Sequence, residues 1–359
     1  MRYLDTKIKD VTKATYKDAE KEALSQAARG VLKAKAWFTS RMLDENGMPA
    51  GVQLNTGWGK GWTWSMNSAP GIKGEITDFS TKALDEVFSK FYDEAPGKTT
   101  LAGEYYDSSG MGKTTQLDYD RGHFSAMRTP LTYAKDTFRP AIFKGMIGFE
   151  YLKSLSDRLH VRGKIVMANE APKNWCWVAP LCDVLGQEAG WIKKGRWMPF
   201  SRDEMILRRM QCGAKPYCII QNVDYVAFAP YVKRYMERCL AYGFMPGFFS
   251  PKSAADDSHY FAHPEFYERD RPLFKKYVPL CRLLSEAGWR PLNALLPAAA
   301  NKDISAEQFG ERYVALFNHS TKSATVKLPR EIRELVTDSL VKGSLTLEPE
   351  TCRVLDLYR

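Results

Sequence analysis

Residues 101–109 read LAGEYYDSS, and this stretch decides the expected fold. A short run of apolar and aromatic residues ends at Asp107, and small polar residues follow. Two later stretches, 164–170 (KIVMANE) and 179–188 (APLCDVLGQE), also place acidic residues at or after apolar runs. A parallel strand buried on both faces has no place for a charge within its apolar run, but its carboxyl end opens into a crevice where a carboxylate can meet a ligand. We therefore expect parallel strands that deliver carboxylates to a common rim.

The middle of the chain alternates between strand-like and helix-like segments. The expected strands are 101–107, 164–169, 179–184, 215–222 and 244–249, and the expected helices are 79–95, 138–160, 201–212, 229–242 and 264–287. Ser201 and Glu204 form the capping box that opens one of these helices. Strands separated by helices indicate a parallel sheet with right-handed crossovers. The predicted fold class is α/β, a (β/α)8 TIM-type barrel that is incomplete or divergent on its N-terminal side, because the first hundred residues do not easily supply the remaining strands.

The N-terminal region combines a helical pattern with an irregular one. Residues 7–36 are expected to form one polar helix, with Gly30 as a break. Gly, Asn and Pro punctuate residues 47–74, which also hold Trp58, Trp62 and Trp64 without a regular period. Long loops within compact domains are usually functional or disordered, and three Trp argue against disorder. These Trp side chains are therefore either stacking platforms in a ligand site or a hydrophobic flap over the barrel.

The pattern changes near the C-terminus. From about residue 309 the sequence alternates apolar and polar residues with a period of two, and Asn318, Pro329, Gly343 and Pro349 mark turns. This pattern predicts a small antiparallel β-sandwich. The expected domains are the barrel at 1–292 and the sandwich at 293–359, joined by residues 293–307.

The composition is that of an ordinary globular protein. Of 359 residues, 44% are hydrophobic and 26% charged, so disordered and fibrous classes are excluded. The 13% aromatic content favours a ligand with polar rings, although any single aromatic residue is more often a large core side chain. The net charge of +10 would attract an anionic partner, which leaves an anionic carbohydrate open. Basic residues alternate with acidic ones along the helices, so we interpret them as solvated faces and expect no nucleic-acid partner.

The cysteines and the absence of certain motifs limit the remaining classes of protein. The cysteines are odd in number and form no CxxC pair: Cys176, Cys182, Cys212, Cys218, Cys239, Cys281 and Cys352. Their usage favours a reducing, cytoplasmic compartment, whereas a secreted or periplasmic location is the alternative if the natural N-terminus lies upstream. We expect no membrane span, no metal and no cofactor, because no long apolar run, HExxH, P-loop or GxGxxG is present. The sequence does not indicate an oligomeric state.

The candidate catalytic residues are carboxylates that follow consecutive predicted strands. They are Asp107, Glu170, Asp183 and Glu188. Cleavage of a glycosidic bond requires two carboxyl groups from different segments, one to protonate the leaving oxygen and one to act as nucleophile or base. Any one of them alone could instead cap a helix or form a salt bridge. Asp107 is the strongest candidate because it ends an apolar and aromatic strand, whereas Glu104 has the opposite parity in that strand.

The candidate substrate-binding residues are polar or aromatic groups near these carboxylates. In LDYDRGHFS, we expect Asp118, Arg121 and His123 to grip hydroxyl groups, or else to form a self-satisfied loop network. The remaining candidates are Asn67, Tyr106, Asn169 and Asn222, together with Trp58, Trp62 and Trp64. A second polar cluster, Asp256, Asp257, His259 and His263, is interpreted as a solvated loop.

Several stretches carry a resemblance to a known superfamily. They are WTWSMNSAP, EYYDSS, LDYDRGHFS, KIVMAN, CDVLGQE and the terminal YVALFNHS and LEPETCRVLDL, which span residues 47–359. With them the chain resembles bacterial glycoside hydrolases of the α-glycosidase-like superfamily, in which a nucleophilic aspartate ends a barrel strand and a β-sandwich follows the barrel. The resemblance implies that Asp107 is the nucleophile and that Glu188, Asp183 or Glu170 is the acid/base. The early strands of the superfamily pattern are missing here.

The sequence thus supports a glycoside hydrolase that acts on an oligo- or polysaccharide by a two-carboxylate, retaining mechanism. A non-catalytic carbohydrate-binding barrel protein is the main alternative. A polyanion binder driven by the +10 charge is a third hypothesis, and it requires affinity that falls steeply with salt.

Overall fold

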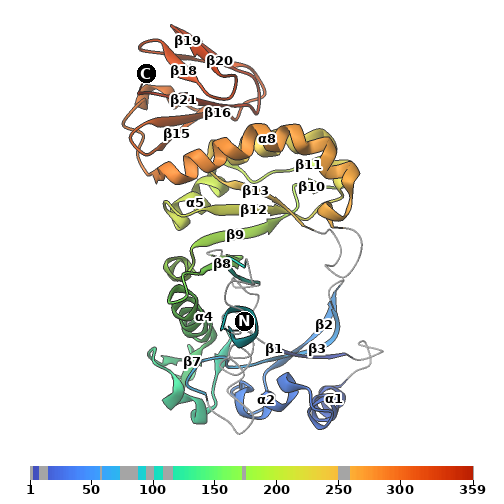
Figure 1. The fold of residues 1–359 in the computed structure, drawn as a ribbon. Helices are drawn as coiled ribbons and strands as arrows, with labels where there is room; N and C mark the ends of the chain where they lie inside the picture. The colour runs from blue at the N-terminus through green and yellow to red at the C-terminus, as the bar shows by residue number, and fades with distance from the viewer. Residues whose placement is uncertain are drawn as a thin grey trace. The chain divides into compact units, whose positions relative to one another are not determined.

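The structure is a computed structural model that describes residues 3–7, 15–56, 59–72, 88–93, 101–107, 116–171, 175–249 and 259–358. The chain divides into two compact units (Figure 1). Unit 1 comprises Met1–Ala168 with Pro180–Cys182, and unit 2 comprises Asn169–Ala179 with Asp183–Arg359. Trp58, Asp256, Asp257 and most of the expected helix 79–95 lie outside the described residues.

Unit 1 begins with an antiparallel sheet covered by two helices. The strands β1 (Tyr3–Lys7), β3 (Gly59–Ser65) and β2 (Gly51–Thr56) lie in that order, and the helices are α1 (Tyr16–Ala28) and α2 (Leu32–Ser40). Thr15 and Asp18 form a capping box that starts α1. Gly30, with φ of +87°, separates the two helices, so the single helix expected over 7–36 is wrong although its break is confirmed. Small alanines of both helices let Trp37 and Trp64 close the core of this layer.

The second part of unit 1 holds short strands and a long helix. Its elements are β4 (Gly103–Tyr106), β5 (Leu117–Asp118), β6 (Thr132–Tyr133), β7 (Pro140–Phe143), α4 (Lys144–His160), β8 (Ile165–Asn169), a π-helical turn (Ser89–Asp93) and a 3-10 helix (Arg121–Ala126). β4 pairs in parallel with β8, as expected for these segments, from Gly103 opposite Ile165 to Tyr106 opposite Ala168. A Cβ at Gly103 would lie 1.8 Å from the Ile165 carbonyl oxygen, so only glycine permits this close approach.

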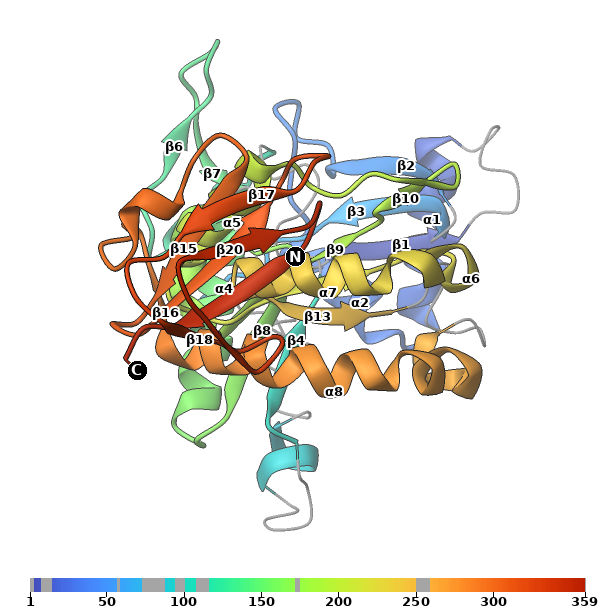
Figure 2. The same cartoon turned by 90° about the horizontal axis from the view of Figure 1, so that it is seen from above.

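Unit 2 contains a parallel sheet in the order β13 (Met245–Phe248), β12 (Tyr217–Gln221), β9 (Val184–Ala189). Its helices are α5 (Arg202–Cys212), α6 (Tyr225–Phe228), α7 (Val232–Ala241) and α8 (Pro264–Ala287), and a hairpin of β10 (Ile192–Lys193) and β11 (Arg196–Trp197) follows β9. α7 and α8 pack on each other and on β13 (Figure 2). The hydroxyl oxygen of Tyr235 on α7 lies within hydrogen-bond distance of the carbonyls of Ile219 (2.5 Å) and Gly247 (3.0 Å), which ties α7 to β12 and β13.

The last part of unit 2 is a pair of antiparallel sheets. One sheet has the order β14 (Trp289–Arg290), β15 (Ile304–Phe309), β16 (Tyr313–Asn318), β21 (Cys352–Asp356), β18 (Ile332–Glu334), β19 (Ser339–Val341). The other consists of β17 (Ala324–Lys327) and β20 (Ser344–Leu347). Alternate residues of these strands, including Val314, Leu316 and Leu355, fill a shared apolar core. We call these strands the C-terminal sandwich, and β16 and β21 pack against α7.

The coarse fold prediction is confirmed, because parallel strands precede an antiparallel C-terminal part. Within the described ranges, however, the parallel strands do not close into a barrel. The strand expected at 179–184 is wrong: a 3-10 helix occupies Cys176–Leu181 and the strand lies at Val184–Ala189. Pro180 explains this shift, since it cannot donate a ladder hydrogen bond within a sheet interior. The loop expected at 47–74 includes the β2–β3 hairpin.

Two further expectations concern the cysteines and the membrane. All seven cysteines are free thiols. None of the helices in the described part of the chain is both long and apolar enough to cross a bilayer.

Candidate functional site

Three side chains of unit 2 meet at the carboxyl end of its parallel sheet. Glu188 is the fifth residue of β9, Asn169 ends β8, and Asn222 directly follows β12. Asn169 Nδ2 donates to Glu188 Oε1 at 2.7 Å, and Asn222 Nδ2 donates to Glu188 Oε2 at 2.5 Å. Each oxygen of the carboxylate is therefore held by a different amide. We call this group the Glu188 site.

The strand register explains why these residues meet. β9 and β12 pair with Ile220 opposite Glu188 and Gln221 opposite Ala189. Asn222 N then donates to Ala189 O at 2.7 Å, which places the Asn222 side chain beside Glu188 at the strand end. Successive side chains of a strand point to opposite faces, so Gln187 points away from the site. Its Oε1 accepts from Tyr217 Oη at 2.9 Å instead.

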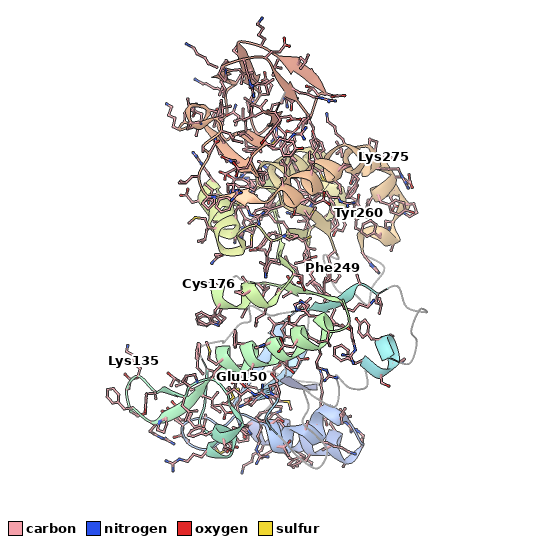
Figure 3. The ribbon with its side chains drawn as sticks, turned by 60° about the vertical axis from the view of Figure 1, so that its left-hand side comes forward. Lys135, Glu150, Cys176, Phe249, Tyr260 and Lys275 are labelled. Carbon is pink, nitrogen blue, oxygen red and sulfur yellow. The ribbon has the colours of Figure 1, made fainter. Side chains whose placement is uncertain are left out.

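A second layer of contacts fixes the strand ends under the Glu188 site. Gln221 is fully buried, and its Oε1 accepts from the backbone N of Trp191 at 3.1 Å. The hydroxyl of Tyr225 bonds to the carbonyls of Gln221 (2.8 Å) and Phe249, so it joins the ends of β12 and β13. Figure 3 labels Phe249 and Tyr260, whose backbones bond to each other at 3.3 Å. Burial raises the pKa of the Tyr225 hydroxyl, which therefore stays protonated at neutral pH.

Some buried polar atoms at this end have no partner among the described residues. They are Oδ1 of Asn222, Nε2 of Gln221 and Nε1 of Trp191. Buried polar atoms of native proteins are usually bonded to protein, water or ligand. The Asn222 oxygen can accept a hydroxyl proton, and the two nitrogens can donate to a hydroxyl oxygen. Sequence patterns did not predict Gln221, Trp191 or Tyr225, although the polar residues that end the apolar run of β12 could have indicated Gln221.

Glu170 lies next to this group. It has φ of +59°, a conformation that is uncommon outside glycine, and its backbone N donates to Asn169 Oδ1 at 2.9 Å. The chain reverses there, and Ala171 forms a bridge to Gly186 of β9. The Asn169 side-chain amide therefore bonds to the backbone of Glu170 through its oxygen and to the Glu188 carboxylate through its nitrogen. Unusual backbone conformations of this kind cluster at functional sites.

Asp183 does not belong to the Glu188 site. It precedes β9, whereas Glu188 is near the end of that strand. Five residues of extended strand separate their Cα atoms by roughly 17 Å. The expectation that Asp183 ends a strand and serves as an acid/base is therefore corrected. The cause is the shifted strand, because Asp183 follows a 3-10 helix and not an apolar strand.

Asp107 lies in unit 1, directly after the last residue of β4, and its side chain is exposed. This position at a strand end agrees with the sequence analysis, and its catalytic role stays a prediction. Tyr106 is buried, and its ring lies 5.5 Å from that of Tyr151 on α4. Tyr106 is thus a core residue of unit 1, and its expected contact with substrate is corrected.

The Asp118–His123 group is a buried network and not an open binding site. Asp118 is 0% exposed; its Oδ1 accepts from the backbone N of Leu43 (3.1 Å) and of Asp120 (3.0 Å). Its Oδ2 accepts from Asn67 Nδ2 (3.1 Å) and lies 2.7 Å from His123 Nδ1. Because Asp118 is fully buried and four protein groups surround its two oxygens, it cannot grip a sugar, and this expectation for Asp118, Asn67 and His123 is corrected.

His123 carries a positive charge in this network. Its Nε2 lies 2.9 Å from the Thr39 carbonyl, which can only accept, and its Nδ1 faces a carboxylate, which also accepts. Both ring nitrogens must therefore donate. Burial works to lower the pKa of His123, but the hydrogen bond and charge of Asp118 outweigh it, so the pKa is raised. The self-satisfied loop network considered for this segment is thus what the structure contains.

The remaining candidates divide by exposure. Trp64 is 0% exposed and packs with Trp37 at 5.5 Å, so it belongs to a core and its predicted role as a stacking platform is corrected. Trp62 is partly exposed and packs edge-to-face on Tyr16, and Arg121 is exposed. Their contacts with substrate stay predictions. Among the described residues, no group of three or more His, Cys, Asp or Glu side chains is arranged to hold a metal ion.

One family match and several solved structures show what the chain is similar to. Residues 306–357 match the family described as the β-galactosidase C-terminal domain. No match was found among curated protein sequences. Among solved structures, the pullulanase from Bacillus acidopullulyticus has a TM-score of 0.47 at 11% identity, over 90% of this chain and 44% of that one. α-Galactosidase I from Mortierella vinacea has a TM-score of 0.36 at 11% identity, over 59% of this chain and 63% of that one. A GH27 β-L-arabinopyranosidase from Geobacillus stearothermophilus has a TM-score of 0.30 at 12% identity, over 64% of this chain and 67% of that one.

These comparisons identify the C-terminal sandwich most directly. Its strands from β16 to β21 lie within the matched residues, so this part of the chain is similar to the C-terminal domain of β-galactosidases. The resemblance found in the sequence is confirmed in this respect. The chain spans less than two thirds of the length of the α-galactosidase and of the pullulanase.

Proposed function

We propose that the chain is a glycoside hydrolase that cleaves an O-glycosidic bond of an oligo- or polysaccharide. The observation that carries the proposal is the Glu188 carboxylate, which two side-chain amides hold at the carboxyl end of a parallel sheet. Charges held in this way are pre-organised for chemistry at a strand end. The match of residues 306–357 to a β-galactosidase domain supports the same class of enzyme. We further propose that the parallel strands belong to a TIM-type barrel.

The proposed mechanism is retaining, with Asp107 as nucleophile and Glu188 as acid/base. The Asp107 carboxylate attacks the anomeric carbon while protonated Glu188 transfers its proton to the leaving oxygen, so the glycosidic C–O bond breaks as the ester bond forms. Glu188 then takes a proton from water, whose oxygen attacks the anomeric carbon and releases Asp107. Asn169 and Asn222 orient the Glu188 carboxyl group through both steps. Trp62 and Arg121 are proposed to contact the sugar.

Activated aryl glycosides test this proposal. A panel of aryl α- and β-glycosides of common neutral and anionic sugars is incubated with the wild-type chain and with Asp107→Asn and Glu188→Gln variants. We expect turnover of at least one substrate by the wild type and none above background by Asp107→Asn. Near-normal rates in Asp107→Asn would reject the nucleophile. A wild type that cleaves no member of the panel or of an oligosaccharide mixture would reject the hydrolase.

The second candidate function is carbohydrate binding without hydrolysis. A cavity of about 570 Å³ on the C-terminal sandwich favours it, with Leu295, Glu311, Arg330 and Tyr358 in its lining. Cavities of this size fit small ligands, and these side chains offer an aromatic face with charged hydrogen-bonding groups. Calorimetric glycan binding that Tyr358→Ala weakens, without release of reducing sugar, would support this function over the first.

A further inference from the structure

A glutamate of the C-terminal sandwich reaches the hairpin that follows the Glu188 site. Glu350 Oε1 accepts from Nε1 of Trp197 at 3.2 Å, and Trp197 ends the β10–β11 hairpin. The same oxygen accepts from Arg238 Nη2 at 3.1 Å, and Oε2 lies 3.3 Å from Nη1 of Arg234. Both arginines are on α7. One carboxylate therefore connects the sandwich, α7 and the hairpin.

Glu350 is itself held rigidly. Its φ is +52°, which a non-glycine residue adopts only when its surroundings impose it, and its backbone N donates to the Asn318 carbonyl at 3.0 Å. The Asn318 side chain is fully buried and bonds to the carbonyl of Leu347 at 2.9 Å, which closes the turn before Glu350. The surroundings thus impose an unusual backbone conformation on Glu350. We interpret this conformation as the means of directing the Glu350 side chain out of the sandwich toward Trp197 and Arg238.

Trp197 links Glu350 to residues next to the Glu188 site. Its ring stacks on Tyr231 at 5.3 Å with an interplanar angle of 5°, and lies edge-to-face on Trp191 at 5.6 Å. Trp191 is three residues after Glu188, and its backbone N donates to Gln221 beside Asn222. The hairpin directly follows the strand that carries Glu188, and it contacts both the turn before α7 and Glu350 of the sandwich.

Arg238 is a second link between Glu350 and the residues that follow the hairpin. Arg238 is 6% exposed, its Nη1 donates to the Phe200 carbonyl at 2.7 Å, and Phe200 packs on Trp191 at 5.4 Å. Loss of the Glu350 charge would leave a buried guanidinium without that partner, which is costly in a protein interior. The hairpin and the residues after it would then be held to α7 by fewer contacts, the aromatic packing and the Arg238–Phe200 hydrogen bond among them.

We infer that Glu350 is a positioning residue: the C-terminal sandwich uses it to hold residues 190–200 in place beside the Glu188 site. The sandwich thereby acts on the rim of the site and is more than an appended domain. The effect on catalysis rests on the proposed function, whereas the effect on the hairpin does not. Glu350 touches no reacting atom and acts through Trp197 and Arg238.

Amide hydrogen exchange measured by mass spectrometry tests this inference on the full chain. In Glu350→Ala, we expect peptides covering 190–200 to exchange roughly tenfold faster or more, because charge-assisted hydrogen bonds are lost there. Glu350→Gln keeps an acceptor oxygen for Trp197 and should restore much of the protection. The matched control is Glu348→Ala, because Glu348 lies in the same turn and its carboxylate accepts from Ser323 Oγ (2.8 Å) of the sandwich. Unchanged exchange of 190–200 in Glu350→Ala, or equal loosening in Glu348→Ala, would overturn the inference.

The kinetic measurement distinguishes this inference from the proposed function. On a glycoside that the wild type cleaves, Glu350→Ala should lower kcat/KM by roughly tenfold, with recovery in Glu350→Gln. If exchange rises and kcat/KM is unchanged, the positioning role toward the site is rejected although the contact is real. If the wild type hydrolyses nothing, the hydrolase proposal fails while the exchange result alone decides whether Glu350 holds the hairpin.

Discussion

The side-chain amide of Asn222 donates a hydrogen bond to Oε2 of Glu188 at 2.5 Å, and this contact joins the carboxyl ends of β12 and β9. Asn169 holds the other carboxylate oxygen at 2.7 Å. A carboxylate held on both oxygens cannot rotate freely toward solvent. The side chain is therefore oriented before a ligand arrives, which is the structural requirement for efficient acid/base catalysis.

Replacement of Asn222 by Ala tests this orientation. A hydrogen bond to a charged group contributes about 1.5–3 kcal/mol, so kcat/KM on an aryl glycoside should fall by roughly 10- to 100-fold. The control is Asp224→Ala, because Asp224 caps α6 through the backbone N of Val226 (2.9 Å) and Ala227 (3.1 Å). That variant should lose about 1 kcal/mol of stability with unchanged kcat/KM. Full activity of Asn222→Ala would show that the contact does not matter to turnover.

The Asp118–His123 ion pair makes a prediction about alkaline pH. The pKa of His123 is raised, so its contribution to stability is full below its ordinary pKa of about 6.5 and is lost as pH rises through the higher folded-state value. Asp118→Asn breaks a buried ion pair and should cost about 3–5 kcal/mol near pH 6. The Tm difference between the wild type and this variant should shrink toward pH 9 in calorimetry. A constant difference across that range would contradict a charged His123.

His319 in the C-terminal sandwich makes the opposite prediction. Burial, followed by the charges of Arg238 and Arg202, lowers the pKa of His319 to about 4. The unfolded chain therefore takes up a proton at this residue near pH 6.5 while the folded chain does not, and stability is lost as pH falls from about 6.5 to about 4. The Tm of His319→Gln should fall less over this interval than that of the wild type. Parallel Tm profiles would contradict a neutral, buried His319.

Gly103 offers a test of the β4–β8 pairing. An added Cβ would lie 1.8 Å from the Ile165 carbonyl oxygen, so Gly103→Ala must push the strands apart, at a cost of about 1–3 kcal/mol or more. The neighbouring exposed Ala102 provides the control, and Ala102→Ser should leave the Tm unchanged. An unaltered Tm in Gly103→Ala would mean that the two strands do not approach this closely.

The regular patterns in the sequence predicted the fold best. Helix α8 has the expected bounds, and the capping box at Ser201 and Glu204 starts α5 as expected, because both signals are local. Strand 179–184 failed because a short apolar run has no intrinsic period, so Pro180 was the better indicator of a boundary. The β2–β3 hairpin was missed because its register depends on the packing of Trp64 under α2, which is not a local property.

The candidate site was only partly predictable for a related reason. The polar residues predicted at strand ends included Glu188, Asn169 and Asn222, and the structure brings these three together because the ends of parallel strands lie on one edge of a sheet. The segment with Asp118 and His123 contains the residue types that are typical of a binding loop. Only the burial of these two side chains shows that they bind each other. Gln221 was not predicted because an amide within an apolar run resembles an interruption of the strand. Its role becomes visible only with its partner, the backbone N of Trp191.

The leaving-group dependence of Glu188→Gln is the most direct measurement of the proposed chemistry. An acid catalyst is needed for a poor leaving group and hardly at all for 2,4-dinitrophenolate, which departs without a proton. For the sugar that the wild type cleaves best, kcat/KM of Glu188→Gln should fall by roughly 10²- to 10⁴-fold on an unactivated glycoside and far less on the dinitrophenyl glycoside. Wild-type rates on both substrates, or an equal loss on both, would contradict Glu188 as the acid/base.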